Sequence, residues 1–478
     1  MDIYFYNTLA HSKDKFKPID EQEVKIYSCG PTVYKDATIG NMRTNIFQDN
    51  LRRTLEYNGY KVKQAMNITD VGHLVSDGDE GEDKMIKSAK QEGKTPLEIA
   101  NYYTKLFFRD LERLNVEIPE IICKATDNIQ DMLKVVEELV KKGYAYETST
   151  AIYFDISKLD KYPVLSNLDV ENQKAGARVE VDTEKRNPHD FAVWIKAPEN
   201  HLMKWDSPWG PSYPGWHIEC SVMAKKYLAD EIDIHAGGED LIFPHHENEI
   251  AQSEAANGVP FAKYWMHNAF LNIDNKKMSK SLGNFFTVRD IAKEYDLQVL
   301  RFFMLSAHYR NPINFSHELM ESAKNSLDRI VTSVMNLTHL EKTAADLPMT
   351  DEEQKVLDLT KDIYKKFEAA MDDDFNTADA ISAVFELVKL ANSNSSETDT
   401  KAYITALKES IVKLADILGL NVVKEEELLD EDVEALINER QQARKDRNFA
   451  RADEIRDELT AKGIVLEDTR EGVRWKRA

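Results

Sequence analysis

The stretch from Val24 to Ile68 decides the fold: VKIYSCGPTVYKDATIGNMRTNIFQDNLRRTLEYNGYKVKQAMNI. Val24–Ser28 alternates as a strand does, and a Cys-Gly-Pro-Thr segment interrupts it. A helical pattern runs from about Gly40 to Tyr57 and ends at an Asn-Gly pair, after which Lys61–Ile68 is strand-like again. The order strand, helix, strand predicts an α/β fold with a parallel sheet. No Gly-x-Gly-x-x-Gly follows the first strand, so the usual dinucleotide fingerprint is missing.

The pattern changes along the rest of the chain. Residues 156–215 are rich in Pro, Asn, Asp and Trp and are predicted to be irregular. From about Val288 onward the strand signals fade and helical periodicity dominates. Helices are expected near 96–114, 127–142, 244–256, 317–340, 351–371, 376–392 and 400–418, strands near 151–155, 232–235 and 269–273, and a helical pair with a strand-like end at 433–478.

Composition excludes several classes of protein. The chain has 478 residues, of which 42% are hydrophobic and 31% charged, so wholesale disorder is excluded. No apolar run reaches the roughly 18 residues of a membrane span, and the first residues lack the pattern of a secretory signal. Three scattered cysteines are too few for a disulfide framework. We therefore expect a cytoplasmic protein that has no membrane partner.

The charge is strongly acidic overall but differs at the C-terminus. The net charge is −22, which does not favour nucleic-acid binding, since phosphates attract a basic face. From Arg440 to Ala478, however, eleven Lys and Arg stand against eight Asp and Glu. This change of sign indicates an anionic partner for the tail.

A helix N-terminus near Thr38 is a candidate phosphate site. Thr38-Ile39-Gly40-Asn41 lies where a loop enters a helix, and helix N-termini offer unpaired N–H groups and a positive dipole end. Gly40 would let a ligand approach the backbone closely. The alternative is a plain helix cap in which Thr38 or Asn41 is the capping residue.

A second candidate is the lysine-rich segment KMSKS at 277–281. Lys277, Lys280 and two serines follow an apolar strand and a turn, and a glycine comes behind them. Such a cationic loop can neutralise phosphate charge that develops in a transition state. The alternative is a solvated surface turn.

A third candidate is a metal site. His245 and Glu249 are four residues apart on a predicted helix, so they share a face, and zinc accepts imidazole, carboxylate and thiolate. Either Cys29 or Cys220 could complete the site. The sequence has no Cys-x-x-Cys, and Ile at position 250 breaks the His-Glu-x-x-His pattern of zinc proteases. The alternative is two polar surface residues and two buried thiols; Cys123, between apolar neighbours, is expected in the core.

These fragments, in this order, resemble the bacterial type of cysteinyl-tRNA synthetase, a family of class I aminoacyl-tRNA synthetases. The resemblance covers nearly the whole chain. It is carried by CGPTVY at 29–34, NITD at 67–70, PGWHIECS at 214–221, FPHHENE at 243–249 and KMSKS at 277–281, and the last segment, Arg440–Trp475, is similar to the family's anticodon-binding segment.

The resemblance implies a fold and a reaction. The fold would be a Rossmann-type catalytic domain with an insertion, then an α-helical bundle, then a small anticodon-binding domain. ATP and L-cysteine would form cysteinyl-adenylate, and the cysteinyl group would pass to the tRNA for cysteine. The expected segments are 1–120 and 206–270 for the two catalytic halves, 121–205 for the insertion, 271–325 for the lysine-loop region, 326–425 for the bundle and 426–478 for the anticodon segment.

The resemblance also implies site residues. One zinc per chain would be held by Cys29, Cys220, His245 and Glu249, and would select the cysteine thiolate, which a serine hydroxyl cannot imitate. No editing domain would then be needed, and a monomer that uses Mg²⁺ with ATP is expected. The other roles would fall to Thr32 and Trp216 for cysteine, to Thr38, Asn41, Lys277 and Lys280 for catalysis, and to Gly40, Lys280, Gly237, Gly238 and Asp240 for ATP.

The tail would read the anticodon, because Arg, aromatic and Asp side chains can contact guanine, stack on an unpaired base and accept from amino groups, respectively. The candidates are Arg444, Phe449, Asp453, Asp468 and Trp475. The chain departs from the family pattern at Thr38, where His is usual, at Phe449, where Trp is usual, and at Ala236, where Gly is usual. Thr cannot carry an imidazolium charge at the α-phosphate, whereas Phe can still stack on a base.

Two other functions remain open. A related ligase joins cysteine to a glucosamine–inositol acceptor in mycothiol synthesis and shares the zinc set and lysine loop. The long helical region and the tail argue against it, since a small acceptor needs no anticodon reader. A non-catalytic, zinc-stabilised RNA-binding relative is favoured only by Thr38.

Overall fold

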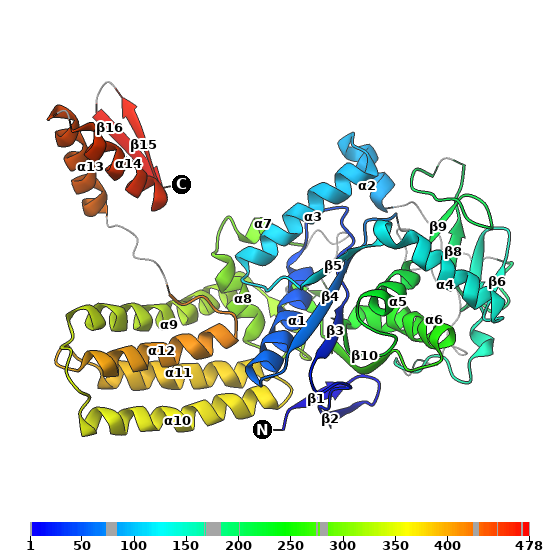
Figure 1. The fold of residues 1–478 in the computed structure, drawn as a ribbon, viewed down its shortest axis with the longest axis horizontal. Coiled ribbons are helices and arrows are strands. Elements are labelled where there is room, and N and C mark those ends of the chain that lie inside the picture. The colour runs from blue at the N-terminus through cyan, green and yellow to red at the C-terminus, as the bar shows by residue number, and fades with distance from the viewer. Residues whose placement is uncertain are drawn as a thin grey trace. The chain divides into compact units, whose positions relative to one another are not determined.

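The structure is a computed structural model, and it describes residues 2–72, 84–166, 168, 183–199, 201–273, 276–277, 285–423, 430–446, 448–469 and 472–477. The chain forms two compact units, Met1–Val422 and Val423–Ala478 (Figure 1). Each unit has a hydrophobic core of its own.

The first unit is built on a parallel sheet of five strands in the order β11-β10-β3-β4-β5. The parallel α/β sheet predicted from the first β–α–β stretch is confirmed. The chain leaves β3 towards β4 on one side and β10 towards β11 on the other, so the strand order reverses between β3 and β10. Ligands of open α/β sheets bind at such a point, beyond the carboxyl ends of the strands. The strands are β3 (Val24–Ser28), β4 (Val62–Ile68), β5 (Ile121–Lys124), β10 (Ile232–Gly238) and β11 (Ala262–Asn268).

Helices cover both faces of this sheet (Figure 1). Because side chains alternate along a strand, Val24 and Ile26 join one core and Tyr27 and Cys29 the other. The first core contains α1, α2 and α3, and the second contains α4, α5 and α6. Cys29 therefore faces α5 and α6. The bounds are α1 (Ile39–Tyr57), α2 (Lys84–Glu92), α3 (Pro96–Arg113), α4 (Ile129–Lys141), α5 (Trp216–Tyr227) and α6 (Glu247–Asn257).

The segment predicted to be irregular contains two strands. β8 (Phe191–Lys196) and β9 (Ser212–Pro214) pair antiparallel with each other, and β8 also pairs with β7 (Ala151–Phe154). The four-stranded sheet β6-β7-β8-β9 is completed by β6 (Ala145–Glu147). The prediction was wrong here because β8 gains its hydrogen bonds from β7, a partner outside the segment that local composition cannot reveal.

Smaller elements complete the first unit. A hairpin, β1 (Tyr4–Asn7) and β2 (Ser12–Lys15), precedes the sheet. β12 (Leu271–Ile273), β13 (Lys276–Lys277) and β14 (Ile313–Phe315) form a three-stranded sheet. Helices α7 (Val288–Ile291) and α8 (Leu297–Leu305) lead to a bundle of α9 (His317–Thr343), α10 (Asp351–Asp372), α11 (Thr377–Asn394) and α12 (Lys401–Ile417), which lie side by side (Figure 1).

The second unit is small. It consists of α13 (Asp430–Lys445), α14 (Phe449–Ala461) and a hairpin of β15 (Ile464–Thr469) and β16 (Gly472–Arg477). Its core is formed by Val433, Ile455, Leu459 and Ile464 among others. The helical pair and strand-like end predicted for this region are confirmed.

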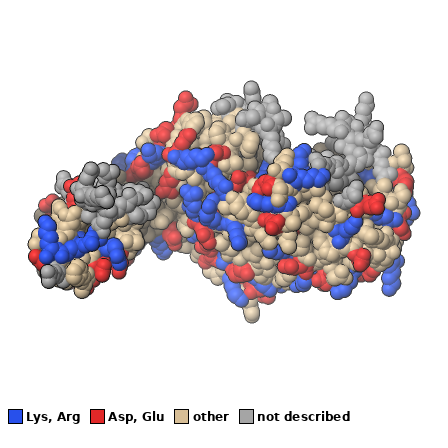
Figure 2. All heavy atoms as spheres, turned by 90° about the horizontal axis from the view of Figure 1, so that it is seen from above, with Lys and Arg blue, Asp and Glu red and all other residues tan. Residues whose placement is uncertain are grey.

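The surface is less uniformly acidic than the total charge suggests. On the face drawn in Figure 2, lysines and arginines are interspersed with acidic side chains. Basic positions are thus available to an anionic partner despite the net charge of −22. Within the described part of the chain, no helix has the length and apolar character needed to cross a membrane.

Candidate active site

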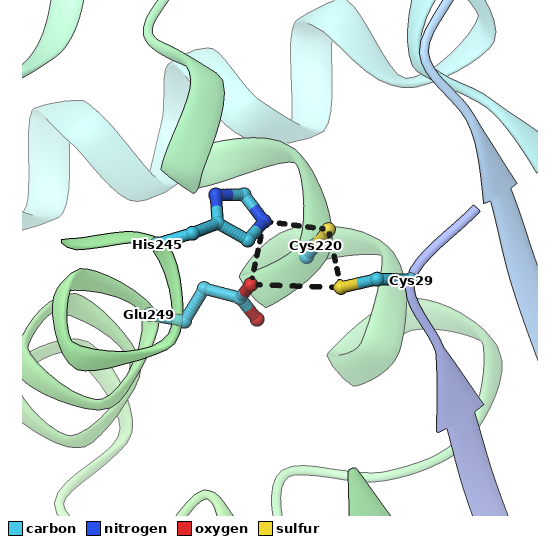
Figure 3. A group of neighbouring side chains, drawn as sticks. All are labelled: Cys29, Cys220, His245 and Glu249. Atoms are coloured by element: carbon cyan, nitrogen blue, oxygen red, sulfur yellow. Dashed lines mark hydrogen bonds and ion pairs between the residues drawn. The ribbon is translucent and has the colours of Figure 1, made fainter. Parts of the chain in front are cut away.

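Four potential metal ligands meet at the point where the strand order reverses (Figure 3). Cys29 directly follows β3, Cys220 lies in α5, His245 precedes α6 and Glu249 lies in its first turn. The alternation that turns Cys29 towards α5 and α6 brings it to the other three. All four side chains are buried or nearly so.

The distances between the donor atoms run from 2.8 to 4.0 Å, around the spacing that a single small cation would need. Cys29 Sγ lies 3.9 Å from Cys220 Sγ and 4.0 Å from Glu249 Oε1. Nε2 of His245 lies 3.6 Å from Cys220 Sγ and 2.8 Å from Glu249 Oε1. Zinc bonds of about 2.0–2.3 Å in a tetrahedron require donor separations of roughly 3.3–3.8 Å. Neither thiol is in a disulfide, and two sulfurs, an imidazole and a carboxylate make a donor set that suits zinc.

The charges of this group also favour a cation. Burial raises the pKa of Glu249, but the adjacent His235 and His245 outweigh it and the pKa falls to about 2. Burial similarly opposes ionisation of Cys29, yet the hydrogen bond with Cys220 and the charge of His235 lower its pKa to about 6. Burial raises the pKa of Cys220 well above its usual range, so Cys29 is the first of the two thiols to ionise. A buried carboxylate and thiolate need positive charge beside them, which a divalent cation would supply. Cys123, by contrast, is a core thiol whose pKa burial raises to about 12.

Two further histidines, which no sequence pattern indicated, lie beside the potential ligands. His217 Nδ1 lies 2.9 Å from His245 Nδ1, so it can fix the ring whose Nε2 faces the cluster. His235 Nε2 lies 2.7 Å from Glu249 Oε2 and fixes the other carboxylate oxygen. The available signal was the alternation of β10, which turns His235 to the same face as Cys29, but its meaning depends on the pairing of β10 with β3.

A second grouping overlaps the first. Cys29, His235, His246 and Glu249 also place one donor atom each within 4.8 Å of one another. Cys29 and Glu249 belong to both groupings, so one cation could occupy either position. Which nitrogen of His246 carries its proton decides whether it can be a ligand.

An open pocket joins the metal cluster to the start of α1. Its walls include Cys29, Thr32 and Trp216 at one end and the N-terminus of α1 at the other. The ring of Trp216 lies 4.2 Å from that of His245, centroid to centroid, and so forms an apolar wall beside the cluster. Of the residues predicted for cysteine binding, ATP binding or catalysis, the structure brings to this pocket Thr32, Thr38, Gly40, Asn41, Trp216, Gly238 and Asp240.

Thr38 is a helix cap as well as a pocket residue. Its hydroxyl accepts from the backbone N–H of Asn41, 3.3 Å away, and the Asn41 side chain accepts from the N–H of Thr38, 3.0 Å away. The N–H of Ile39 donates to the carbonyl of Phe286, so within the first turn the N–H of Gly40, a residue that lines the pocket, is the one left for a ligand. The cap and the phosphate site that we considered as alternatives are thus compatible.

The two glycines of β10 pack too closely for side chains. A Cβ at Gly237 would lie 2.8 Å from Cε1 of His246, and one at Gly238 would lie 2.4 Å from Oδ1 of Asp240. Gly238 also borders the pocket, whereas Gly237 contacts the histidine beneath it.

The structure describes the lysine-loop and tail residues only in part. Lys277 is in β13, where its backbone pairs with Asn272, and Lys280 lies outside the described residues. In the second unit, Arg444 ends α13 and is exposed, Phe449 begins α14 with 60% of its surface exposed, and Asp453 lies on the exposed side of α14. Asp468 pairs with Val473 and Trp475 with Leu466 in the hairpin.

Family models match three parts of the chain. Residues 15–325 match the catalytic domain described as tRNA synthetases class I (C), residues 366–422 match the DALR domain, and residues 426–475 match the cysteinyl-tRNA ligase anticodon binding domain.

Similar proteins extend over the full length. A cysteine–tRNA ligase of Lachnospira eligens is 61% identical over 99% of both chains, and one of Brevibacillus brevis is 50% identical over 100% of both. Among solved structures, methionyl-tRNA synthetase of Mycobacterium tuberculosis with methionyl-adenylate superposes with a TM-score of 0.56 at 14% identity, over 83% of this chain and 89% of that one. A ternary complex of LeuRS from Agrobacterium radiobacter gives 0.60 at 13% identity, over 84% of both chains. These structures share the fold.

Proposed function

The chain belongs to the cysteine–tRNA ligase family of class I aminoacyl-tRNA synthetases, and from this premise we propose that it joins L-cysteine to its tRNA in two steps, through cysteinyl-adenylate, with zinc selecting the cysteine. The observation that carries the proposal is the pocket that connects the Cys29–Cys220–His245–Glu249 group to the N-terminus of α1. It offers a thiol-selective end and a phosphate-binding end within one cavity. We also propose that the protein acts as a monomer in the cytoplasm.

Selection of cysteine would occur at the buried end of the pocket. Bound zinc would supply a Lewis-acidic position that takes a thiolate as an additional ligand and leaves a serine hydroxyl protonated. Trp216 forms the adjacent apolar wall, and His217 and His235 hold two of the ligands in place. Because pocket shape alone discriminates weakly between cysteine and serine, selection at this end of the pocket would make an editing site unnecessary.

Adenylate formation would occur at the other end. The carboxylate of cysteine attacks the α-phosphate of Mg²⁺-bound ATP, so positioning and charge neutralisation supply most of the rate. The N–H of Gly40 and the side chain of Asn41, beside the Thr38 cap, would hold the phosphates, and Gly238 and Asp240 would contact the nucleoside side. Lys280, and Lys277 with it, would neutralise the pyrophosphate. Thr38 would contribute a hydroxyl in place of an imidazolium.

Charging of tRNA with labelled cysteine tests this function, with serine as the control amino acid. We expect cysteine to be transferred to its tRNA and serine to be excluded. Cysteine-dependent pyrophosphate exchange without tRNA charging would favour the ligase with a small sugar acceptor, and the absence of both would favour the non-catalytic relative. The match of residues 426–475 to an anticodon binding domain supports the tRNA acceptor.

Ending the chain after Val422 should separate the two half-reactions. Residues Val423–Ala478 form their own compact unit with its own core, so the first unit is expected to stay folded and to keep cysteine-dependent pyrophosphate exchange. Charging should fall by about 10²-fold or more, because a loss of a few phosphate and base contacts costs about 3 kcal/mol or more. Circular dichroism checks the folding of the shortened chain.

A milder form of the same experiment uses the full chain. Arg444→Ala and Phe449→Ala change two exposed side chains and should weaken charging while leaving exchange unchanged. A folded, shortened protein that charges tRNA at the full rate would show that the second unit does not read the anticodon.

A further inference from the structure

Three hydrogen bonds in series connect Cys29 to the N-terminal hairpin. Cys29 Sγ lies 3.3 Å from Nε2 of His246, and Nδ1 of His246 lies 2.7 Å from Nε2 of His267. Nδ1 of His267 in turn lies 2.8 Å from Oγ1 of Thr8. Both histidines are buried, whereas Thr8, just after β1, is half-buried. The series therefore leads from the metal cluster to the edge of the unit.

The bonds of this series must all point the same way. A neutral imidazole has one N–H and one lone pair, and each ring here uses both nitrogens. A second proton on either ring would place a cation in a buried group of histidines, which is costly. Either Thr8 donates and Cys29 accepts, or Cys29 donates and Thr8 accepts.

The metal site decides between the two directions. A cysteine that binds a metal does so as a thiolate and has no proton to donate, so it can only accept. His246 must then carry its proton on Nε2, His267 must do the same, and the hydroxyl of Thr8 must donate to Nδ1 of His267. On the premise of the proposed zinc site, we propose that Thr8 is a positioning residue whose hydroxyl fixes the Nε2–H tautomers of His267 and His246 and so holds an N–H donor against Cys29.

This direction also selects between the two possible metal positions. With a proton on Nε2, His246 has no lone pair towards Cys29, so the grouping of Cys29, His235, His246 and Glu249 lacks a ligand. The grouping with Cys220 and His245 remains complete. If the hydrogen bonds ran in the opposite direction, Nε2 of His246 would carry a lone pair and would compete with the other ligands for the cation.

The place of Thr8 does not depend on its hydroxyl. The N–H of Thr8 donates to the carbonyl of Trp265, 2.8 Å away, and the side chain of Asn7 bonds to the N–H of Trp265 and the carbonyl of Lys263, each at 3.1 Å. These bonds hold the end of β1 along β11. Thr8→Val therefore exchanges a hydroxyl for a methyl of similar shape, and Thr8→Ser keeps the hydroxyl.

The experiment measures zinc affinity and histidine tautomers in the full chain. Competition with a chelator should show that Thr8→Val binds zinc about 10–100-fold more weakly than the unmodified protein, because without the hydroxyl His246 no longer keeps its N–H on Cys29, and a ligand that loses its hydrogen-bond partner usually costs this much. Thr8→Ser should bind zinc within about threefold of it, because its hydroxyl can make the same bond. In zinc-loaded protein labelled with [¹⁵N]histidine, His246 and His267 should both carry the proton on Nε2, with resonances assigned through His267→Gln.

Each other outcome counts against a specific statement. Equal zinc affinity in Thr8→Val, or equal losses in Thr8→Val and Thr8→Ser, would overturn the role of the hydroxyl while the zinc site stands. Protons on Nδ1 of both rings in the unmodified protein would overturn the direction of the series. This measurement uses the unmodified protein, so it does not depend on whether Thr8→Val folds. An unmodified protein that binds no zinc would overturn the metal site and this inference together.

Discussion

A Cys220→Ser variant is expected to lose stoichiometric zinc and, with it, the preference for cysteine over serine. A serine oxygen at position 220 cannot replace a thiolate 3.9 Å from Cys29 and 3.6 Å from His245, because it does not ionise near neutral pH. The cation should then be lost or held weakly. Discrimination should fall from about 10⁴ or more, typical of a site built for one polar group, to about 10², typical of shape alone. Metal analysis and pyrophosphate exchange with each amino acid measure the two effects.

Cys123→Ser is the matched control, since it makes the same exchange at a buried thiol outside the cluster. Cys123 donates to the carbonyl of Met66, 3.3 Å away, and a serine hydroxyl can do the same. This variant should retain one zinc per chain and normal selection. A Cys220→Ser protein that retains zinc and activates cysteine at the normal rate would exclude Cys220 as a ligand.

A Lys280→Ala variant is expected to form cysteinyl-adenylate about 10²–10³-fold more slowly, the usual effect of removing one preorganised group that stabilises transition-state charge. Zinc content should stay at one per chain, because the cluster comes from β3, α5 and α6 and not from the lysine loop. Pyrophosphate exchange at saturating ATP measures the rate.

Lys276→Ala provides the control for charge. It removes one lysine from β13, four positions from Lys280, so a general loss of positive charge would affect both variants equally. We expect exchange by Lys276→Ala within about threefold of normal, as for a charge without a direct role. Unaltered exchange in Lys280→Ala would identify the loop as a surface turn.

The sequence predicts best where the cause is local. Helix α1 was expected from about Gly40 to Tyr57 and is observed at Ile39–Tyr57, because Thr38 caps its start and an Asn-Gly pair ends it. The bundle helices were predicted for the same reason, since each buries one periodic face. β8, β9 and β11 were not predicted, because their hydrogen bonds come from strands far away in the sequence.

The residues of the candidate site likewise fall into those that local sequence predicts and those that depend on distant packing. His245 and Glu249 could be paired from their helical spacing alone, whereas the two thiols were assigned to them through the family resemblance. His217, His235, His246 and His267 come from separate elements, and only the packing of α5 and α6 on β10 and β11 brings them together. No local pattern reports that packing.

The wide separation of the proposed metal ligands along the chain has a consequence for how the protein is made. Cys29 and Cys220 are 191 positions apart, and the sheet β6-β7-β8-β9 lies between them in the sequence. A growing chain cannot assemble the cluster until α6 has left the ribosome. Closing a loop of this size costs about 5 kcal/mol of chain entropy, which the pairing of β3 with β10 must overcome before a cation can bind.

Zinc would thus act on the abundance of the protein as well as on its accuracy. A cation that binds only the assembled sheet stabilises it in proportion to the logarithm of its free concentration. In cells starved of zinc, the sheet would then open more often, and the protein would be degraded sooner. A low zinc supply would then reduce tRNA charging through faster protein turnover, before mischarging of the tRNA with serine became important.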